Sequence, residues 1–385
     1  MTLHLALVPR DALFCKDGRG WFTSETGRGH ALEWPYPSTV RGALRAVWGR
    51  RREQHLGRAL TRDEWRDLTA PIVLGRTLAL RRRWSGAPGP WERVWPAPAD
   101  LLVREDGHDI RLDPRPLADV ETLGRIDPRD PGGARERLWT ARPGKIKPGV
   151  RPRWWSERQL VPWLAGQEPA REPAPRLLRR LQTHVSIAAD RGTAAEEMLF
   201  SHELVETLDR QYEWAIGCET EFPSHEHVDT ATLGSDARLA RVETVPASLF
   251  DVPDALLRAF EGRPRGLRLV AVTPCAFERG WLPTAFACDR ERREFRGRLP
   301  GVDTELVLRA ALVERALGVS GWDIEHNRPR PTTRMVPPGA VYFFTRVDDR
   351  PFTPSDARAL WLAAVGDRTD EGFGRVVPGI WSPAS

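Results

Sequence analysis

The sequence is short of lysine, cysteine and long apolar runs. Among its 58 basic residues only Lys16, Lys145 and Lys147 are lysines, so arginine carries nearly all of the positive charge. The four scattered cysteines form no Cys-x-x-Cys pair, which argues against a zinc ribbon or a disulfide framework and fits a reducing compartment. No apolar run approaches the roughly 18 residues of a membrane span, and the first residues lack the features of a signal peptide. We therefore expect a cytoplasmic protein.

Signatures of common enzyme and metal sites are also missing. No HExxH, GxSxG, P-loop or EF-hand pattern occurs. Cys218, His225 and His227 match no standard ligand spacing, so we expect neither a metal nor a cofactor. His30, in a glycine-flanked loop, is the best candidate for a general base acting on a ribose 2′-OH, and His184 comes second. For both, a structural or RNA-contacting role is favoured over catalysis, because no pair of histidines converges in the sequence.

Arginine and tryptophan, by contrast, are abundant. Residues 41–83 hold twelve arginines against four acids, and the whole chain has 16 tryptophans at a net charge of only +5. Arginine binds phosphate bidentately and stacks on bases, and tryptophan adds stacking surface. The composition is therefore compatible with a nucleic-acid partner, although a GC-rich genome also enriches arginine.

A compositional break divides the chain. Residues 86–180 hold 15 of the 34 prolines and few periodic segments, which predicts a long insertion of loops. Within it, Lys145 to Arg153 bring cations next to Trp154 and Trp155, a pattern typical of single-strand binding surfaces. The favoured alternative is that the tryptophans pin a loop onto the body of the protein. If exposed, they could instead form a partner interface.

A basic helix is predicted after Pro37. Ser38 is a good N-cap, and an apolar stripe begins at Val40 with helical spacing. Arg41 and Arg45 share another face, one turn apart. A helix N-terminus with free N–H groups and two arginines is a plausible phosphate site, and an ordinary amphipathic helix fits equally well.

A glycine-rich loop lies near the end of the chain, at Gly372-Phe373-Gly374-Arg375. Glycine allows bare backbone N–H groups to approach a phosphate, and Arg375 adds a fork of donors. Taken alone, the pattern fits a tight turn before an edge strand better.

Strand and helix patterns alternate along both halves of the chain. Leu3, Leu5 and Leu7 alternate with other residues as in a half-buried strand, and residues 91–103 resemble an edge strand interrupted by proline. Further strand patterns occur at residues 72–80, 184–190, 211–219, 267–272 and 340–344. Residues 304–317 fit a strand or a helix, and residues 354–365 fit a helix. We predict an α+β fold of two ferredoxin-like (RRM-like) domains, residues 1–245 with the insertion at about 86–180, and residues 246–385.

The order of motifs resembles the third subunit of the Cmr effector complex, type III-B of the CRISPR systems, a RAMP protein. The motifs are Leu13-Phe14-Cys15-Lys16-Asp17-Gly18-Arg19, residues 37–45, Pro96-Ala97-Pro98-Ala99-Asp100, residues 184–200, Leu233-Gly234, Arg238-Leu239-Ala240, the glycine-rich loop and Pro378-Gly379. Ser235 and Met198 depart from the pattern at positions where the family usually has glycine.

The resemblance implies a non-catalytic subunit of two RAMP domains. It would hold the 5′ repeat-derived tag of the crRNA and pair with the large polymerase-like subunit, beside the backbone RAMP subunits, in antiviral defence. The residues expected to contact RNA are Lys16, Arg19, His30, Ser38, Thr39, Arg41, Arg45, His184, Arg238, Arg241, Gly372, Gly374 and Arg375. A metal-independent RAMP endoribonuclease that processes guide RNA is the alternative, with His30 as base and Lys16 or Arg19 over the scissile phosphate. A third alternative is a purely architectural subunit that contacts only protein.

Overall fold

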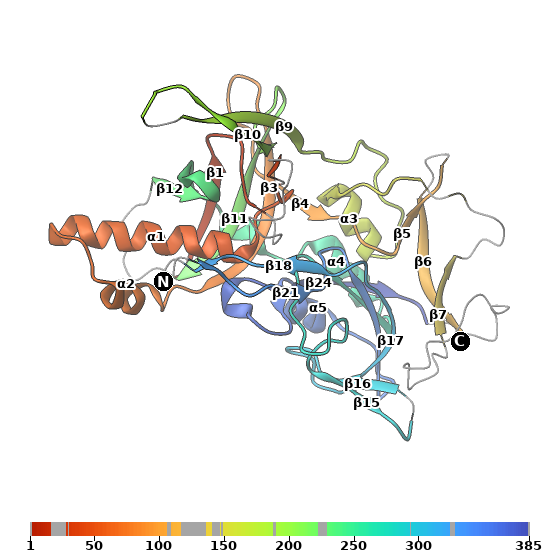
Figure 1. Ribbon diagram of the computed structural model, residues 1–385. Helices are drawn as coiled ribbons and strands as arrows, with labels where there is room; N and C mark the ends of the chain where they lie inside the picture. Colours follow the sequence, from red (N-terminus) through yellow and green to blue (C-terminus); the bar gives the residue numbers. More distant parts are fainter. Residues whose placement is uncertain are drawn as a thin grey trace.

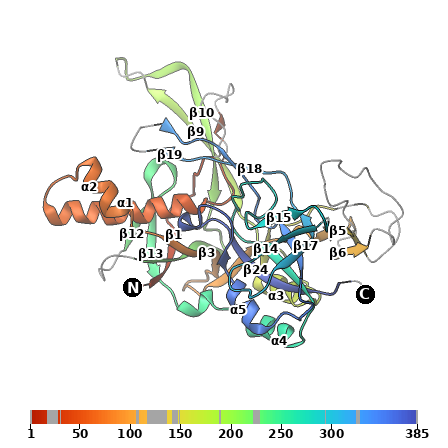
Figure 2. The same cartoon turned by 90° about the horizontal axis from the view of Figure 1, so that it is seen from below.

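The computed structural model describes residues 2–16, 28–29, 31–105, 109–116, 136–140, 147, 149–187, 190–221, 229–292, 294–323 and 328–383. Two seven-stranded antiparallel sheets dominate it and helices are few, so the fold is a mixed, sheet-rich one. A helical arm and a long hairpin, β9 with β10, project from the body in different directions (Figures 1 and 2).

The first sheet is built from strands within residues 2–244, which we call the first half of the chain. Its strands in spatial order are β12 (Thr230–Leu233), β13 (Arg238–Thr244), β1 (Thr2–Pro9), β11 (Tyr212–Glu221), β3 (Leu74–Arg83), β4 (Glu92–Pro96) and β8 (Trp154–Ser156). β11 is antiparallel to both β1 and β3, so these two strands run parallel with β11 between them. The chain passes from β1 to β3 through α1 (Pro37–Leu56) and α2 (Arg62–Thr69), which form the helical arm.

The second sheet comes from the second half of the chain. Its strands in spatial order are β15 (Phe286–Asp289), β16 (Glu294–Gly297), β17 (Leu306–Leu312), β22 (Val341–Arg346), β14 (Gly266–Ala271), β24 (Arg375–Trp381) and β23 (Ala363–Ala364). Helices α4 (Asp254–Glu261) and α5 (Pro354–Leu360) pack against β24. The sequence pattern of residues 304–317 fitted a strand or a helix, and the structure has the strand β17 there. The helix predicted over residues 354–365 ends earlier, at Leu360.

Smaller elements decorate the two sheets. They are β2 (Arg28–Gly29), β5 (Leu101–Val103), β6 (Asp109–Pro116), β7 (Glu136–Thr140), α3 (Glu157–Leu164), β9 (Leu178–Ile187), β10 (Ala194–Glu206), β18 (Leu317–Val319), β19 (Trp322–Asp323), β20 (Arg328–Pro329), β21 (Thr333–Met335) and the 3₁₀ turns η2 (Ser235–Ala237), η3 (Ala247–Phe250) and η4 (Thr369–Glu371).

The two sheets share one large apolar core. On β1, Leu5 and Leu7 pack with α1, whereas Ala6 and Val8 belong to the cluster that includes β14 and β22. The predicted first strand is confirmed, but it is buried on both faces rather than half-buried, because the second half of the chain covers the face that alternation leaves open. The apolar stripe predicted for α1 is confirmed: its buried residues include Val40, Ala43, Leu44 and Val47.

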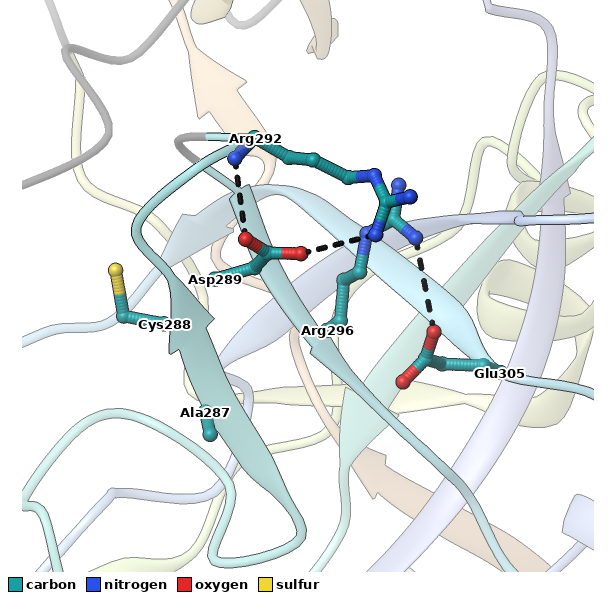
Figure 3. A pocket seen from close by; sticks show the side chains of 6 residues that line it. All are labelled: Ala287, Cys288, Asp289, Arg292, Arg296 and Glu305. Carbon is teal, nitrogen blue, oxygen red and sulfur yellow. Dashed lines mark hydrogen bonds and ion pairs between the residues drawn. The ribbon is translucent and has the colours of Figure 1, made fainter.

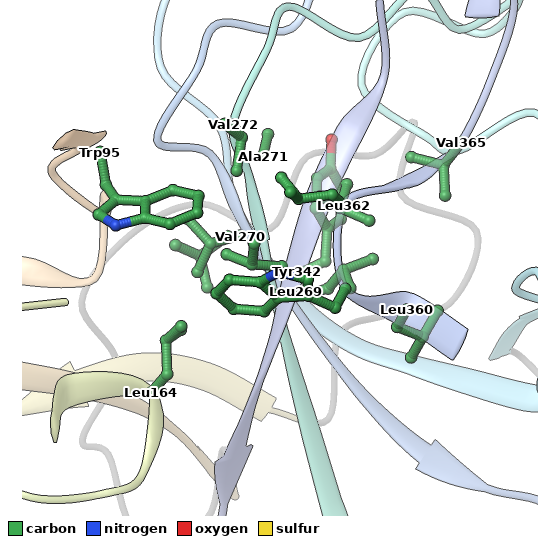
Figure 4. Packing of buried hydrophobic residues seen from close by; sticks show 14 of the residues in the cluster. Trp95, Leu164, Leu269, Val270, Ala271, Val272, Tyr342, Leu360, Leu362 and Val365 are labelled. Carbon is green, nitrogen blue, oxygen red and sulfur yellow. The ribbon is translucent and has the colours of Figure 1, made fainter. Parts of the chain in front are cut away.

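The described parts of residues 86–180 contain strands and a helix rather than loops alone. β4 and β8 extend the first sheet, with β4 between β3 and β8 rather than at its edge, and Trp95 and Leu164 lie against Leu269 and Val270 of the second sheet (Figure 4). Pro96 is tolerated because it ends the strand that contains it. Spacing could not reveal this segment as core, because its strands are short and its buried side chains pack against residues of the second sheet, far away in the sequence.

Trp154 and Trp155 are both buried, so they do not form an exposed partner interface. Trp154 packs edge-on against Trp34 and Trp214, and its Nε1 donates a hydrogen bond to Glu33 at 2.9 Å. The favoured alternative, in which these tryptophans anchor the segment to the body, is therefore the one that the structure supports.

Candidate nucleic-acid-binding cleft

A cleft of about 1170 Å³ separates the helical arm from the second half of the chain. One wall consists of α1, α2 and the η2 turn, and the other of residues 320–323, 329–330, 368 and 371. Eight of its lining residues are basic and three are acidic. The basic ones are Lys16, Arg41, Arg45, Arg50, Arg62, Arg66, Arg330 and Arg368. The cleft therefore combines both halves of the chain in one cationic surface, which suits a polyanion.

Five predicted residues line this cleft together: Lys16, Ser38, Thr39, Arg41 and Arg45. Arg41 Nε donates to the carbonyl oxygen of Ile72 at 2.9 Å, and its Nη1 lies 2.8 Å from Asp370 Oδ2. Arg45 Nε donates to Thr69 Oγ1 at 3.0 Å. Partial burial, and then the nearby Arg41 and Arg330, lower the pKa of Arg45, so this guanidinium lies in a positive environment that an anion would relieve.

The start of α1 differs from the prediction in one detail. Tyr36, not Ser38, occupies the N-cap position, and no side chain caps the helix. Pro37 takes the first helical position, where its missing N–H costs nothing, and Ser38 follows inside the first turn. No acidic residue lies in this turn, so the positive end of the helix is not neutralised locally. Ser38 and Thr39 therefore border the cleft as first-turn residues rather than as a cap.

The glycine-rich loop is packed into the protein rather than opening toward the cleft. The amide of Gly372 donates to Thr369 O at 3.1 Å, and that of Gly374 donates to Pro274 O at 2.9 Å. Phe373 between them is fully buried. These glycine amides are already used inside the protein, so the expected phosphate cradle is not formed by them. Both glycines have positive φ, which explains why the loop needs glycine.

Arg375 also points inward. Its guanidinium donates to the carbonyl oxygens of Leu74, Leu362 and Thr369 at 3.3–3.4 Å, and burial lowers its pKa. Leu74 is the first residue of β3 in the first sheet, and Arg375 is the first residue of β24 in the second sheet. The hydrogen bond between them therefore links the two sheets. The prediction that Arg375 serves as a charge partner for phosphate does not fit this position.

Arg238 and Arg241 lie on opposite faces of β13, because they are three positions apart and successive side chains of a strand alternate between its faces. Arg238 follows the η2 turn that lines the cleft, is largely buried and lies 3.8 Å from Asp236. Arg241 lies 2.7 Å from Glu243 on the other face, in a group that also contains Arg82 and Glu213. The structure therefore places Arg238 beside the cleft and Arg241 away from it.

A row of aromatic rings crosses the base of the β9–β10 hairpin. His184 stacks on Phe200 with ring centroids 5.2 Å apart, and His202 stacks on Phe14 at 4.2 Å. The two histidine rings are 4.9 Å apart, so a histidine pair does converge, which the sequence did not reveal. Burial and the neighbouring His184 lower the pKa of His202, which favours the neutral imidazole. Lys16 and Arg238 are close enough to contribute to this shift, so the row adjoins the cleft.

Two predicted residues, Arg19 and His30, lie outside the described residues, as do Lys145 of the proposed basic stretch and His225 and His227. Within the described ranges, no three His, Cys, Asp or Glu side chains are grouped so that they could hold a metal ion. In the same part of the chain, no helix is long and apolar enough to cross a membrane.

Sequence reasoning missed the second helix of the arm. Arg62, Trp65 and Arg66 of α2 line the cleft, and Trp65 lies flat on α1, where any side chain at Gly49 would collide with its ring. A signal was present, because Thr61 and Glu64 form a capping box that starts this helix. Trp322 and Arg330 approach from the opposite wall, and no local pattern indicated that these residues would face α1.

A second, much smaller pocket of about 260 Å³ lies at β15 and β16 (Figure 3). Asp289 Oδ1 accepts from the backbone amide of Arg292 at 3.1 Å, and Arg296 lies 3.7 Å from Glu305. Its charges are paired with one another, so it offers no comparable binding surface.

Comparison with known proteins gives a family and two similar structures. A chain in the cryo-EM structure of the Type III-B Cmr-beta bound to cognate target RNA is 12% identical, with a TM-score of 0.45 and coverage of 88% of this chain and 86% of that one. A chain in the AMPPnP-bound state 1 of that assembly is 11% identical, with a TM-score of 0.43 and the same coverage. No curated protein sequence matches. The family model described as CRISPR-associated protein (Cas_Cmr3) matches residues 5–381, nearly the whole chain. The chain therefore belongs to the Cmr3 family of CRISPR-associated proteins, as its motifs predicted.

Proposed function

We propose that this protein is a non-catalytic RNA-binding subunit of a type III-B CRISPR effector complex, and that its cleft holds the 5′ repeat-derived tag of the crRNA. In this role it pairs with the large polymerase-like subunit beside the backbone RAMP subunits, in the cytoplasm, in antiviral defence. Family membership supports the place in the complex. The cationic cleft between the arm and the second half is the observation that carries the RNA-binding role.

Strand order supports two ferredoxin-like domains within this subunit. In chain order β1, β3, β11 and β13 are the first to fourth strands, and their spatial order is fourth, first, third, second. The strands β14, β17, β22 and β24 repeat this order in the second sheet. It is the arrangement of a βαββαβ unit, in which a helix connects two parallel strands that flank a third. The proposed boundary between residues 245 and 246 falls after β13.

The lining of the cleft favours single-stranded RNA over a small ligand. Its volume exceeds the roughly 300–1,000 Å³ of typical small-molecule pockets. Arginines along α1 and α2 can follow a phosphate backbone, while Trp65 and Trp322 offer ring faces for unstacked bases. Duplex RNA hides its bases in a deep groove, so stacking surfaces of this kind suit a single strand.

Replacing both arginines of the α1 face tests the role of the cleft. Arg41→Ala with Arg45→Ala should weaken binding of a labelled tag RNA by about tenfold or more at roughly 0.1 M salt. The slope of log K against log salt should fall by about 1.4, because two phosphate contacts are lost. The double variant Arg258→Ala with Arg290→Ala removes the same charge from exposed sites outside the cleft lining and should retain binding. Equal losses in both double variants would show that only net charge matters and would remove the cleft from the proposal.

Co-purification tests the place in the complex. The tagged protein should carry short RNAs that share one repeat-derived 5′ end, together with a large polymerase-like subunit. A protein that runs alone and without RNA would contradict the effector role.

The converging histidines favour one second candidate, a metal-independent endoribonuclease that processes guide RNA. The rings of His184 and His202 are 4.9 Å apart, and Lys16 is near enough to contribute to the lowered pKa of His202, so a neutral base and a cation belong to the same region. Labelled repeat RNA, incubated with the protein in EDTA, separates the two functions. Cleavage that His202→Ala, His184→Ala or His30→Ala abolishes, and that the exposed His55→Ala retains, would establish the nuclease; intact RNA supports the binding subunit.

A further inference from the structure

The carboxylate of Asp370 already pairs with Arg41, one of the arginines that line the cleft. Asp370 of the η4 turn lies with Oδ2 2.8 Å from Arg41 Nη1. The side chain of Asp370 is 58% exposed whereas that of Arg41 is 15% exposed. The Arg41 side chain is thus largely buried in the wall, whereas the carboxylate paired with it is open to solvent.

Arg41 is positioned independently of this carboxylate. Its Nε donates to the carbonyl oxygen of Ile72 at 2.9 Å, which fixes the direction of the guanidinium plane. A guanidinium presents the same donors to a carboxylate as to a phosphate, so a group that replaced Asp370 would find the donor in place.

The neighbouring acid behaves differently. Glu371 accepts two hydrogen bonds from Arg368, each of 2.9 Å, and this pair is largely sheltered. Asp370, by contrast, is an exposed member of a pair at the surface, and such pairs contribute little to stability. Its carboxylate can therefore leave Arg41 at small cost, whereas Glu371 is held by the protein.

Resting on the proposed function, we propose that Asp370 occupies the position of an RNA phosphate on Arg41 and that the bound RNA displaces it. Asp370 is thus a residue that sets affinity, because it competes with the ligand for Arg41. The ligand group concerned is a phosphodiester of the RNA backbone, not a base.

A charge-removing substitution with the same shape separates this role from a stabilising one. Asp370→Asn keeps an acceptor beside Arg41 but removes the negative charge. It should tighten binding of a labelled single-stranded tag RNA by about three- to fivefold, the range expected for one exposed ion pair. The gain should shrink as salt is raised, because salt weakens the ion pair between Asp370 and Arg41 and therefore the competition that the substitution removes.

The experiment measures RNA affinity for four full-length proteins: wild type, Asp370→Asn, Arg41→Ala, and the two combined. A control, Asp254→Asn, removes the same charge from an exposed residue of α4 outside the cleft lining. Thermal unfolding of each variant checks that the fold is retained. We expect tighter binding for Asp370→Asn, no change for Asp254→Asn, and no gain from Asp370→Asn once Arg41 is gone.

The outcomes distinguish this inference from the function on which it rests. If Arg41→Ala weakens binding but Asp370→Asn leaves it unchanged or weaker, Asp370 is not a competitor and the inference is wrong, while the RNA-binding role stands. A gain that Asp254→Asn reproduces, or that persists without Arg41, also overturns it, because the effect is then one of net charge. If wild type and Asp370→Asn both bind no RNA, the proposed function itself fails and the inference falls with it.

Discussion

Arg268 and Asp100 form a fully buried ion pair between the two halves of the molecule, with Nε and Oδ2 2.9 Å apart. Arg268 lies on β14 in the second sheet, and Asp100 belongs to the proline-rich segment of the first half. Arg268 also donates to the carbonyl oxygen of Trp163 at 3.0 Å, and the indole of Trp163 donates to Asp100 at 3.0 Å. The segment is thus fastened to the second sheet by charge as well as by apolar packing.

Arg268→Met should lower the free energy of unfolding by about 3–5 kcal/mol, because Asp100 is left as a buried charge without its partner. Burial already raises the pKa of Asp100 against the pull of Arg268. The loss should therefore be smaller in acid, where the protonated carboxyl carries no charge. Urea unfolding at several pH values measures this, with the exposed Arg258→Met as a control that should change stability little. Equal stability of the two variants would contradict the role of the pair.

Gly374→Ala should destabilise the protein far more than Gly280→Ala. Both glycines have nearly the same positive φ, 75° and 76°, so each substitution carries the left-handed penalty of about 1–2 kcal/mol. A Cβ at Gly374 would also overlap the carbonyl oxygen of Val365, whereas Gly280 has open space. Thermal unfolding of the pair measures the difference, and similar melting temperatures would show that the loop tolerates a side chain.

Trp65→Leu should weaken binding of single-stranded RNA by about 1–3 kcal/mol, the value of one base stacked on an aromatic ring. Trp84→Leu is the matched control, since Trp84 is exposed but lies outside the cleft lining. Fluorescence anisotropy with a labelled RNA checks both. Unaltered affinity in Trp65→Leu would mean that the cleft holds only the phosphate backbone.

Native protein at about pH 8 should react with iodoacetamide at Cys288 alone. Burial raises the pKa of Cys15, Cys218 and Cys275 to about 12, so their thiols stay protonated and covered, whereas Cys288 is half-exposed. Peptide mass spectrometry should find one modified cysteine before denaturation and all four after it. Rapid labelling of Cys15 would indicate that the strand beside the cleft opens readily.

Local sequence patterns were enough for the family, the stripe of α1 and the pairing of Arg41 with Arg45 on one helix face. The family rests on the order of motifs along the chain, whereas the two features of α1 depend on residues a few positions apart, where the helical period decides which side chains meet. The same holds for β14, which lies within one residue of its predicted bounds at each end.

Tertiary structure decided the rest of the site. Gly374 and Arg375 fit a phosphate loop by composition, yet their donors end on backbone carbonyls, because the second sheet packs against the start of β3. Conversely, Trp65 and Arg330 line the cleft although the sequence did not predict it. Contacts between residues far apart in the chain leave no trace in local periodicity. Spacing therefore determined which residues share a face of one element, and only the packing of the two sheets determined which faces remain open to a ligand.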